Sequence, residues 1–218
     1  MKLLTILSIL TLACGSAMGA ILYEQSFEDE SWTGNRYTDT GDAAVDHDLV
    51  NNPDESWVDV PGADATYLTT GGVGLTDGDY VGVTSYTGGG IGSYPDGVQG
   101  YQFSDTDGTM LLTFDFQAGA THCSFWIYVL DDGYEVGDNV TISYGTHEFL
   151  NIGEPDLEAM AGSWHYFGGS IDGTGQLVIS VTTNGSYEGI VLDHVIIADD
   201  GTIANEDATW GQVKNLFK

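Results

Sequence analysis

Residues 177–198 read LVISVTTNGSYEGIVLDHVIIA, and this stretch decides the fold. In Leu177–Thr182 the side chains of Leu177, Ile179 and Val181 occupy every second position. A period of two is that of a β-strand with one buried face. After a few turn residues, Gly189–Ala198 forms a second apolar run, which is expected to be a strand as well. Two strands this close together, with no helical stripe between them, indicate an antiparallel β-protein.

The same pattern recurs toward the N-terminus. Leu112, Phe114 and Phe116 alternate with polar residues, and Ser124–Leu130 is apolar on both faces, which predicts a central strand. Further strands are expected over 21–27, 79–86, 99–103, 140–144 and 164–168, with long loops over 28–62. Short strands between Gly-rich turns predict an all-β fold, an antiparallel jelly-roll-like β-sandwich over residues 20–198 with a short C-terminal helix.

The N-terminal segment has the features of an export signal. Lys2 is followed by the apolar run Leu3–Ala13 and then by small residues up to Gly19-Ala20. We therefore expect residues 1–19 to be a cleaved signal peptide, with no membrane-spanning segment, because a spanning helix needs ~20 apolar residues. The sequence before Cys14 leaves attachment of a lipid to that cysteine as an alternative. The predicted localisation is secreted or at the cell surface.

The C-terminal segment differs from the predicted sandwich. Residues 199–208 form a polar linker, and residues 209–218 are expected to form a short amphipathic helix or tail. Its apolar side chains are Trp210, Val213, Leu216 and Phe217, and Lys214 and Lys218 would lie near the helix C-terminus, as the helix dipole prefers. Two interpretations remain open: the segment docks on the sandwich, or it is a signal for attachment to the cell surface.

The charge of the chain limits its partners. There are 33 Asp and Glu against 4 Lys and Arg, and no cationic residue lies between Arg36 and Lys214. Nucleic acid and anionic membranes are therefore excluded, since both are bound through cationic side chains. The acidic residues suit a salty external medium or the binding of divalent cations, and they also suit a surface that resists aggregation. The oligomeric state stays open.

Both ends of the predicted sandwich carry motifs of a known kind. Ser26-Phe27-Glu28 is followed by Trp32, and Tyr187–Val195 ends on an apolar strand containing Asp193. With Cys123–Trp126 between them, these motifs resemble the jelly-roll sandwiches of extracellular carbohydrate-binding modules and MAM adhesion domains. The resemblance implies a glycan or an extracellular protein surface as partner. It also implies a structural calcium ion between Glu28 and Asp193, because the first and last strands of such folds lie side by side.

Two further sets of residues could bind ligands. Asp105 and Asp107, before Gly108, resemble part of a calcium loop, although a hairpin turn between two predicted strands explains them better. The aromatic residues could stack against sugar rings or could belong to the core. The candidates for such a sugar-binding platform are Trp32, Trp57, Tyr86, Tyr94 and Tyr101.

Catalysis is an alternative with one candidate site. Glu154, Asp156 and Glu158 have the Glu-x-Asp-x-Glu spacing of laminarinase-type glycoside hydrolases, which would place three carboxylates on one face of a strand. Pro155 argues against a strand. Cys123 is expected to be a buried side chain and not a nucleophile. We therefore expect a secreted, non-catalytic binding or adhesion module stabilised by calcium, with a glycoside hydrolase or a structural surface protein as alternatives.

Overall fold

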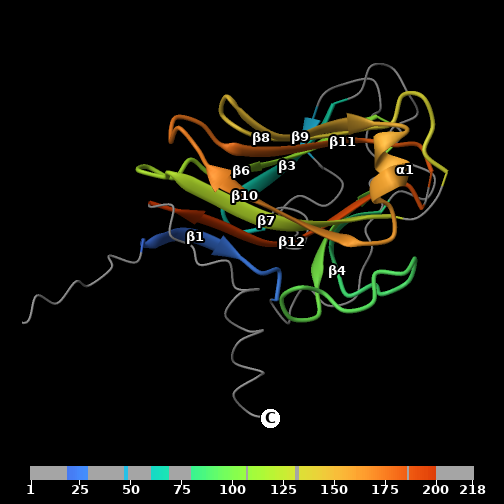
Figure 1. Cartoon of the computed structure of the whole chain (residues 1–218), viewed down its shortest axis with the longest axis horizontal. Helices are drawn as coiled ribbons and strands as arrows, with labels where there is room; N and C mark the ends of the chain where they lie inside the picture. The colour runs from blue at the N-terminus through green and yellow to red at the C-terminus, as the bar shows by residue number, and fades with distance from the viewer. Residues whose placement is uncertain are drawn as a thin grey trace, which may run out of the picture.

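The computed structural model describes residues 19–28, 47–48, 60–68, 80–106, 108–130, 133–185 and 187–199. Two antiparallel sheets pack face to face, and the helix α1 (Asp156–Met160) lies at one end of them (Figure 1). The prediction of an all-β antiparallel sandwich is thereby confirmed. The predicted C-terminal helix lies outside the described residues, as do the signal peptide before Gly19 and most of the polar linker.

Within the described residues, the first sheet has six strands. Its order is β10-β7-β12-β5-β4, and β1 pairs with β12 beside the end of β5. The bounds are β1 (Ile21–Gln25), β4 (Tyr80–Thr84), β5 (Gly100–Ser104), β7 (His122–Val129), β10 (Trp164–Ser170) and β12 (Gly189–Ala198). The sequence correctly predicted β7 as a central strand, since it lies between β10 and β12.

The second sheet covers the inner face of the first. Its order is β2-β3-β6-β11-β8-β9. The bounds are β2 (His47–Asp48), β3 (Ala63–Leu68), β6 (Thr109–Phe114), β8 (Asn139–Tyr144), β9 (His147–Gly153) and β11 (Leu177–Thr182). The alternation of Leu177, Ile179 and Val181 points these three side chains into the core, where all are fully buried.

The core lies between the two sheets and is dominated by aromatic and branched side chains. Phe103, Phe125 and Leu112 are fully buried, and Phe125 makes ring contacts with Phe149 and Phe167 at the sandwich edge. Burial of such side chains stabilises each by about 1.5–3 kcal/mol before entropy is subtracted. The fold therefore needs no disulfide, and Cys123, the free cysteine among the described residues, is one more buried core residue.

Strand β12 is shared between two partners along the same edge. Its first half, Gly189–Leu192, pairs with β5, and its second half, from Val195, pairs with β1. Between the halves the pairing with β7 is irregular, from Asp193 to Ile196, as at a β-bulge. We call the place where β5 gives way to β1 the sheet junction.

Some local expectations need correction. Asp105–Gly108 does not form a hairpin turn: β5 and β6 belong to different sheets, so this segment connects the two layers. Strands β3 and β9 were not predicted. Strand β9 pairs irregularly with β8, and buried and exposed side chains do not alternate strictly along it. Within the described ranges, none of the helical segments has the length and apolarity needed to cross a membrane.

Candidate functional site: the sheet junction and the aromatic face

The sheet junction is built around Glu28, which follows β1. Its Oε1 atom accepts hydrogen bonds from the backbone N–H groups of Val98 at 2.8 Å and Gln99 at 2.7 Å. Its carboxylate lies against Gly97, where a Cβ atom would approach to 2.1 Å. Gln99 Nε2 donates in turn to Phe27 O at 2.9 Å. Glu28 therefore holds the loop that precedes β5 against the end of β1.

Asp193 is the second acidic residue of the junction. Its side chain is completely buried, and Oδ2 accepts a hydrogen bond from Asp96 N at 2.9 Å. Its Oδ1 atom is buried and has no hydrogen-bond partner among the described residues. Burial raises the pKa of Asp193 to about 8; hydrogen bonds from the backbone N–H groups of Asp96 and His194 oppose this increase, and the charges of Asp96 and Glu28 add to it. Glu28 and Asp193, the calcium ligands implied by the resemblance, thus lie at the same junction, together with Asp96.

Backbone strain is concentrated at this junction. Phe27 has φ +61° and His194 has φ +47°, in the left-handed region that bulky residues rarely adopt. Such conformations each cost of order 1–3 kcal/mol and persist where surrounding contacts determine them. Phe27 directly precedes Glu28 and His194 directly follows Asp193, so the contacts of the junction maintain two unfavourable backbone conformations.

The junction meets part of the requirements of a calcium ion. Calcium takes six to eight oxygen ligands, which include backbone carbonyl groups and water as well as carboxylates. The buried Oδ1 of Asp193 is an oxygen in need of a partner, and the charges of Asp96 and Glu28 act on the same carboxyl group. In the described part of the chain, no group of three or more His, Cys, Asp or Glu side chains is arranged to hold a metal ion. The side chains of the described residues alone therefore do not complete a calcium site, and an ion here would also need backbone or water oxygens.

The outer face of the first sheet is divided into a covered half and an open half. The loop between β4 and β5 covers the row formed by Trp164, Tyr128 and Val191. Trp164 Nε1 donates to Ile91 O at 3.3 Å, and Tyr128 OH donates to Gly89 O at 3.0 Å. Because these side chains are fastened beneath the loop, this half of the face is packed.

Two of the predicted sugar-stacking residues belong to that packed half. Tyr94 is buried against Trp164 with ring centroids 5.7 Å apart, and its hydroxyl lies 2.6 Å from Tyr86 O. Tyr86 is half-buried beside the same cluster. Tyr101 points into the core and is fully buried. Tyr94 and Tyr101 therefore contribute packing. Trp32 and Trp57 lie outside the described residues.

The open half carries a different pair of aromatic side chains. Tyr166 of β10 is 39% exposed, and Trp126 of β7 is half-buried beside it, with ring centroids 5.2 Å apart. A Cβ atom on Gly168 would lie 2.7 Å from the Tyr166 hydroxyl oxygen, so the ring lies along the strand over this glycine. We call Trp126 and Tyr166 the aromatic platform.

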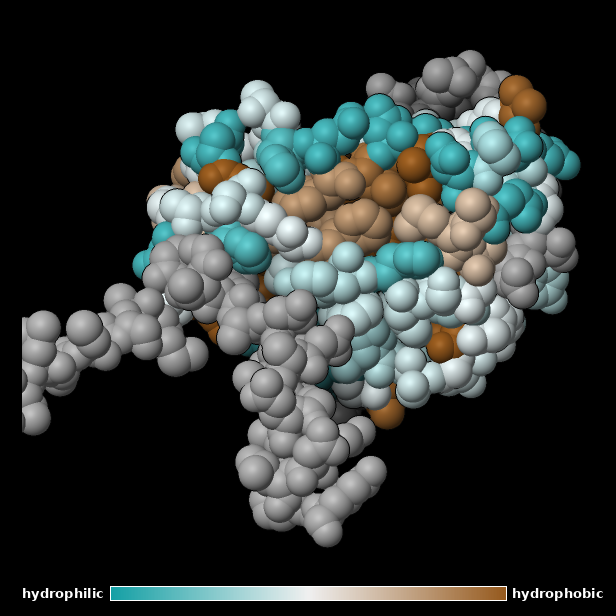
Figure 2. Space-filling model, in the orientation of Figure 1, coloured by the Kyte–Doolittle hydropathy of each residue, from teal (hydrophilic) through white to brown (hydrophobic). Residues whose placement is uncertain are grey.

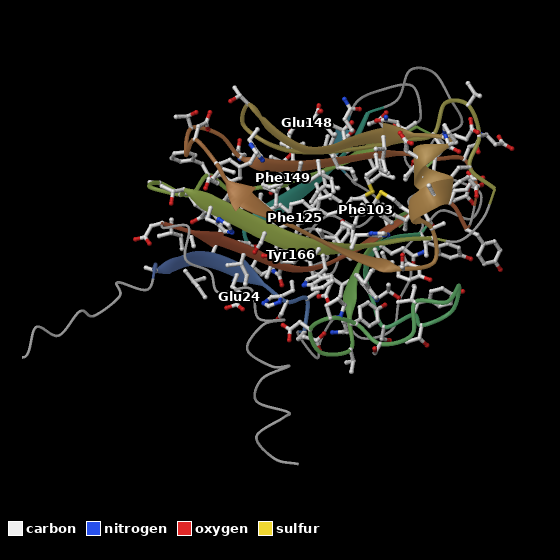
Figure 3. All side chains as sticks on the ribbon, viewed as in Figure 1. Glu24, Phe103, Phe125, Glu148, Phe149 and Tyr166 are labelled. Atoms are coloured by element: carbon white, nitrogen blue, oxygen red, sulfur yellow. The ribbon has the colours of Figure 1, made fainter. Side chains whose placement is uncertain are left out.

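Polar groups accompany the platform on the same sheet. Trp126 is paired with Asp193 across β7 and β12. His194 Nε2 lies 3.1 Å from Glu24 Oε1, and the Glu24 side chain is 47% exposed. Figure 3 shows Tyr166 and Glu24 on the first sheet, away from the second. The surface thus combines an exposed ring with hydrogen-bonding groups.

The predicted platform omitted Trp126 and Tyr166. In sequence, Trp126 lies within the apolar run of β7 and is indistinguishable from a core residue. Its outward direction follows from the opposite direction of Phe125 and Ile127, which are fully buried. Alternation within β7 was therefore the signal that could have identified Trp126. The exposure of Tyr166 depends on the position of β10 at the sheet edge.

Asp105 follows Ser104, which pairs with Gly189 at the start of β12, whereas β1 pairs with the other end of β12. Asp105 is buried, follows β5 and adopts φ +55°. Burial, and then the charge of Asp138, raises the pKa of Glu188 to about 7, and Asp105 contributes to the same increase. Asp138 Oδ2 accepts a hydrogen bond from Glu135 N at 2.6 Å. Asp107, the other residue of the predicted calcium loop, lies outside the described residues.

The candidate catalytic carboxylates do not share a strand. Residues 154 and 155 form a turn, and Asp156 and Glu158 lie on α1, with both side chains exposed. The strand required for three carboxylates on one face is therefore absent from 154–158, because the period of a helix replaces the period of two. Burial also raises the pKa of the Cys123 thiol, which disfavours a thiolate nucleophile.

Together the geometry defines an antiparallel β-sandwich module with a clamped sheet junction and an exposed aromatic platform. No family model matches the chain, and no curated protein matches it. Among solved structures it is similar to the K3 cleaved adhesin domain of Lys-gingipain from Porphyromonas gingivalis. That similarity has 14% identity over 71% of this chain and 98% of that chain, with a TM-score of 0.39.

Two carbohydrate-binding domains of known structure are similar to the chain to about the same degree. TmCBM61, in complex with β-1,4-galactotriose, is 16% identical over 69% of this chain and 97% of its own, with a TM-score of 0.37. A xylan-binding domain from CBM 22 is 14% identical over 66% of this chain and 90% of its own, also with a TM-score of 0.37. At these values the ligand and partner have to be inferred from this chain's own surface.

Proposed function

We propose that this chain is a secreted, non-catalytic glycan-binding module whose β-sandwich is stabilised by calcium at the sheet junction. The observation that carries the glycan part is the aromatic platform, Trp126 and Tyr166, on the open half of an otherwise packed face. An exposed tyrosine ring beside a half-buried tryptophan on a rigid sheet offers a flat apolar surface at low entropic cost. The apolar face of a sugar ring matches such a surface.

The neighbouring polar groups suit sugar hydroxyls. Glu24 accepts hydrogen bonds, and His194, 3.1 Å from it, can donate or accept according to its tautomer. The formal net charge of −29 disfavours a polyanionic ligand, because such a ligand would be repelled and the described residues contain no Lys or Arg to offset the repulsion. We therefore expect an uncharged polysaccharide as the ligand.

Depletion from solution by insoluble polysaccharides tests the proposal. The chain beginning at Ala20 is mixed with a panel of uncharged and acidic polysaccharides, and the protein left in solution is measured. We expect depletion by an uncharged member and ~2- to 10-fold weaker binding for Tyr166→Ala, since one stacked aromatic contact contributes of order 0.5–1.5 kcal/mol. Tyr187→Ala is the matched control, because Tyr187 is an exposed tyrosine, 54% accessible, outside the platform.

The outcomes separate the functions that were considered. Depletion that is lost with Tyr166→Ala and kept with Tyr187→Ala supports glycan binding at the platform. No depletion by any polysaccharide contradicts it and leaves an adhesive or structural surface protein as the alternative. Release of reducing sugar would contradict the non-catalytic part of the proposal.

Calcium is proposed for the junction on chemical grounds. A buried carboxylate oxygen without a partner is costly, and a cation would supply the partner and keep Asp193 ionised. Asp193 and Asp96 would hold the ion together with backbone or water oxygens, and Glu28 would fix the adjoining loop through Val98 and Gln99. Thermal unfolding measured with calcium and with chelator should show a higher Tm with calcium. Equal Tm values would contradict the calcium part of the proposal, and the depletion assay with Tyr166→Ala tests the glycan part separately.

A further inference from the structure

One edge of the sandwich carries partly buried apolar side chains from both sheets. Strands β9 and β10 are the last strands of their sheets and lie on the same side of the molecule (Figure 1). The ring of Phe125 contacts Phe149 of β9 at 5.2 Å and Phe167 of β10 at 5.7 Å, so the two edges adjoin. We define the edge patch as the partly buried apolar residues of β9, α1 and β10, which are Phe149, Leu150, Ile152, Met160, Ala161 and Phe167.

The edge patch is surrounded by acidic groups. Figure 2 shows a hydrophobic area at this edge, with hydrophilic residues above and below it, and Figure 3 places Phe149 within that area. Glu148 on β9 is exposed, and Glu154, Asp156 and Glu158 next to α1 are exposed as well. A complementary partner should therefore be apolar on one side and cationic on the other.

We propose that residues 209–218 of the same chain dock on the edge patch. This segment reads TWGQVKNLFK and contains two of the chain's 4 Lys and Arg residues, Lys214 and Lys218. Its apolar residues, Trp210, Val213 and Phe217, recur at spacings of three and four, which is one face of a helix. The apolar face would cover the patch, and the two lysines would lie near its acidic margin.

The position of the last described residue makes this docking reachable. In the first sheet Ala198 pairs with His122, and His122 pairs with Ser170 at the end of β10. The chain therefore leaves the sandwich two strands from the β10 edge, which is ~10 Å at a spacing of about 4.8 Å. The stretch 200–208 can span up to ~30 Å when extended, at roughly 3.3 Å per residue. A ten-residue helix is ~15 Å long, about the length of a short edge strand.

Charge favours this occupant over a second copy of the chain. Two copies would bring together two acidic margins on proteins of formal net charge −29, and like charges in contact oppose association. Attachment through residues 209–218 also raises their effective concentration at the patch, to the millimolar range for short linkers. An intramolecular contact needs only weak intrinsic affinity.

Hydrogen exchange at the two edge strands tests the docking. Three forms are compared at low protein concentration: the chain from Ala20 to Lys218, the same chain ended at Ala208, and the full-length double variant Glu148→Lys with Glu158→Lys. We expect at least ~5-fold faster exchange of β9 and β10 backbone amides in the second and third forms. Asp64→Lys is the matched control, because Asp64 is an exposed acid on β3 at the other side of its sheet, and it should exchange like the unmodified chain.

Each outcome decides the proposal. Faster edge exchange in the shortened chain and in the double variant, at every protein concentration, supports docking within one chain. Equal exchange with and without residues 209–218 overturns it and favours the attachment-signal interpretation of that segment. Protection that rises with protein concentration also overturns it, because the occupant would then be a second copy.

Discussion

Replacement of Asp193 by Asn tests the electrostatics of the sheet junction. In the fold the Asp193 carboxyl is completely buried, and burial raises its pKa from an ordinary value of 3.8 to about 8. Asn has nearly the same shape as the protonated carboxyl and keeps an oxygen for the backbone N–H of Asp96. The Asp193→Asn variant therefore removes the titration and leaves the packing in place.

The size of the effect follows from linkage between protonation and folding. Between pH 4 and pH 8 the folded protein without calcium keeps a proton on Asp193, whereas the unfolded chain has lost it. Stability therefore falls as the pH rises, by about 1.4 kcal/mol per pH unit for this group. From pH 5 to pH 7 the unmodified chain without calcium should lose ~3 kcal/mol of unfolding free energy relative to Asp193→Asn. This is a large fraction of a typical stability of about 5–15 kcal/mol.

Urea unfolding at pH 5, 6 and 7 in chelator measures this difference. All other groups titrate in both forms, so the difference in unfolding free energy between them isolates Asp193. Asp64→Asn is the control at an exposed position on β3, and it should follow the unmodified chain. Parallel pH profiles for the unmodified chain and Asp193→Asn would refute the reasoning, because Asp193 would then be ionised in the fold. With calcium bound, the pH-dependent loss should disappear in the unmodified chain only.

Three further changes test other contacts. Gly168→Ala should weaken glycan depletion several-fold, because the new Cβ would lie 2.7 Å from the Tyr166 hydroxyl oxygen and displace the ring from the platform; unchanged depletion would contradict a role for the Tyr166 ring. Tyr134→Phe should lower the unfolding free energy in urea by about 1–3 kcal/mol, since the buried hydroxyl lies 2.8 Å from Gly189 O and 3.1 Å from Gly189 N. Unchanged stability would show that water replaces it. Glu28→Ala should speed limited proteolysis between β4 and β5, because two backbone N–H groups lose their acceptor; an unchanged cleavage rate would contradict the clamp.

Much of the fold could be predicted from local pattern. The alternation in Leu177–Thr182 correctly predicted a strand with one buried face, and the apolar run of β7 correctly predicted a central strand, because the direction of each side chain in a strand follows from its position. The pattern failed for β9, where irregular pairing with β8 breaks the period of two. It also failed for 105–108, since a short turn between two strands does not reveal whether they join the same sheet.

The candidate site was predictable only in part. The pairing of Glu28 with Asp193 came from the resemblance of the chain ends, and the structure places both at the sheet junction. The aromatic platform was missed because Trp126 lies in an apolar run, as core residues do, whereas Tyr94 lies in a polar loop, as surface residues do. In the fold the Trp126 ring reaches the outer face of the sheet and Tyr94 is buried. Tyr94 is 7% exposed beneath the loop that it belongs to, and the neighbouring strand edge leaves Tyr166 accessible.

The sequence by itself determined the class of fold and the charge, because these depend on composition and on the period of side chains along each strand. Only the tertiary structure decided which residues form the junction and the platform. The junction requires β12 to pair with β5 and β1 in turn, and the platform requires β10 to be the last strand of its sheet. Both depend on pairing between segments far apart in the chain, which no local pattern encodes.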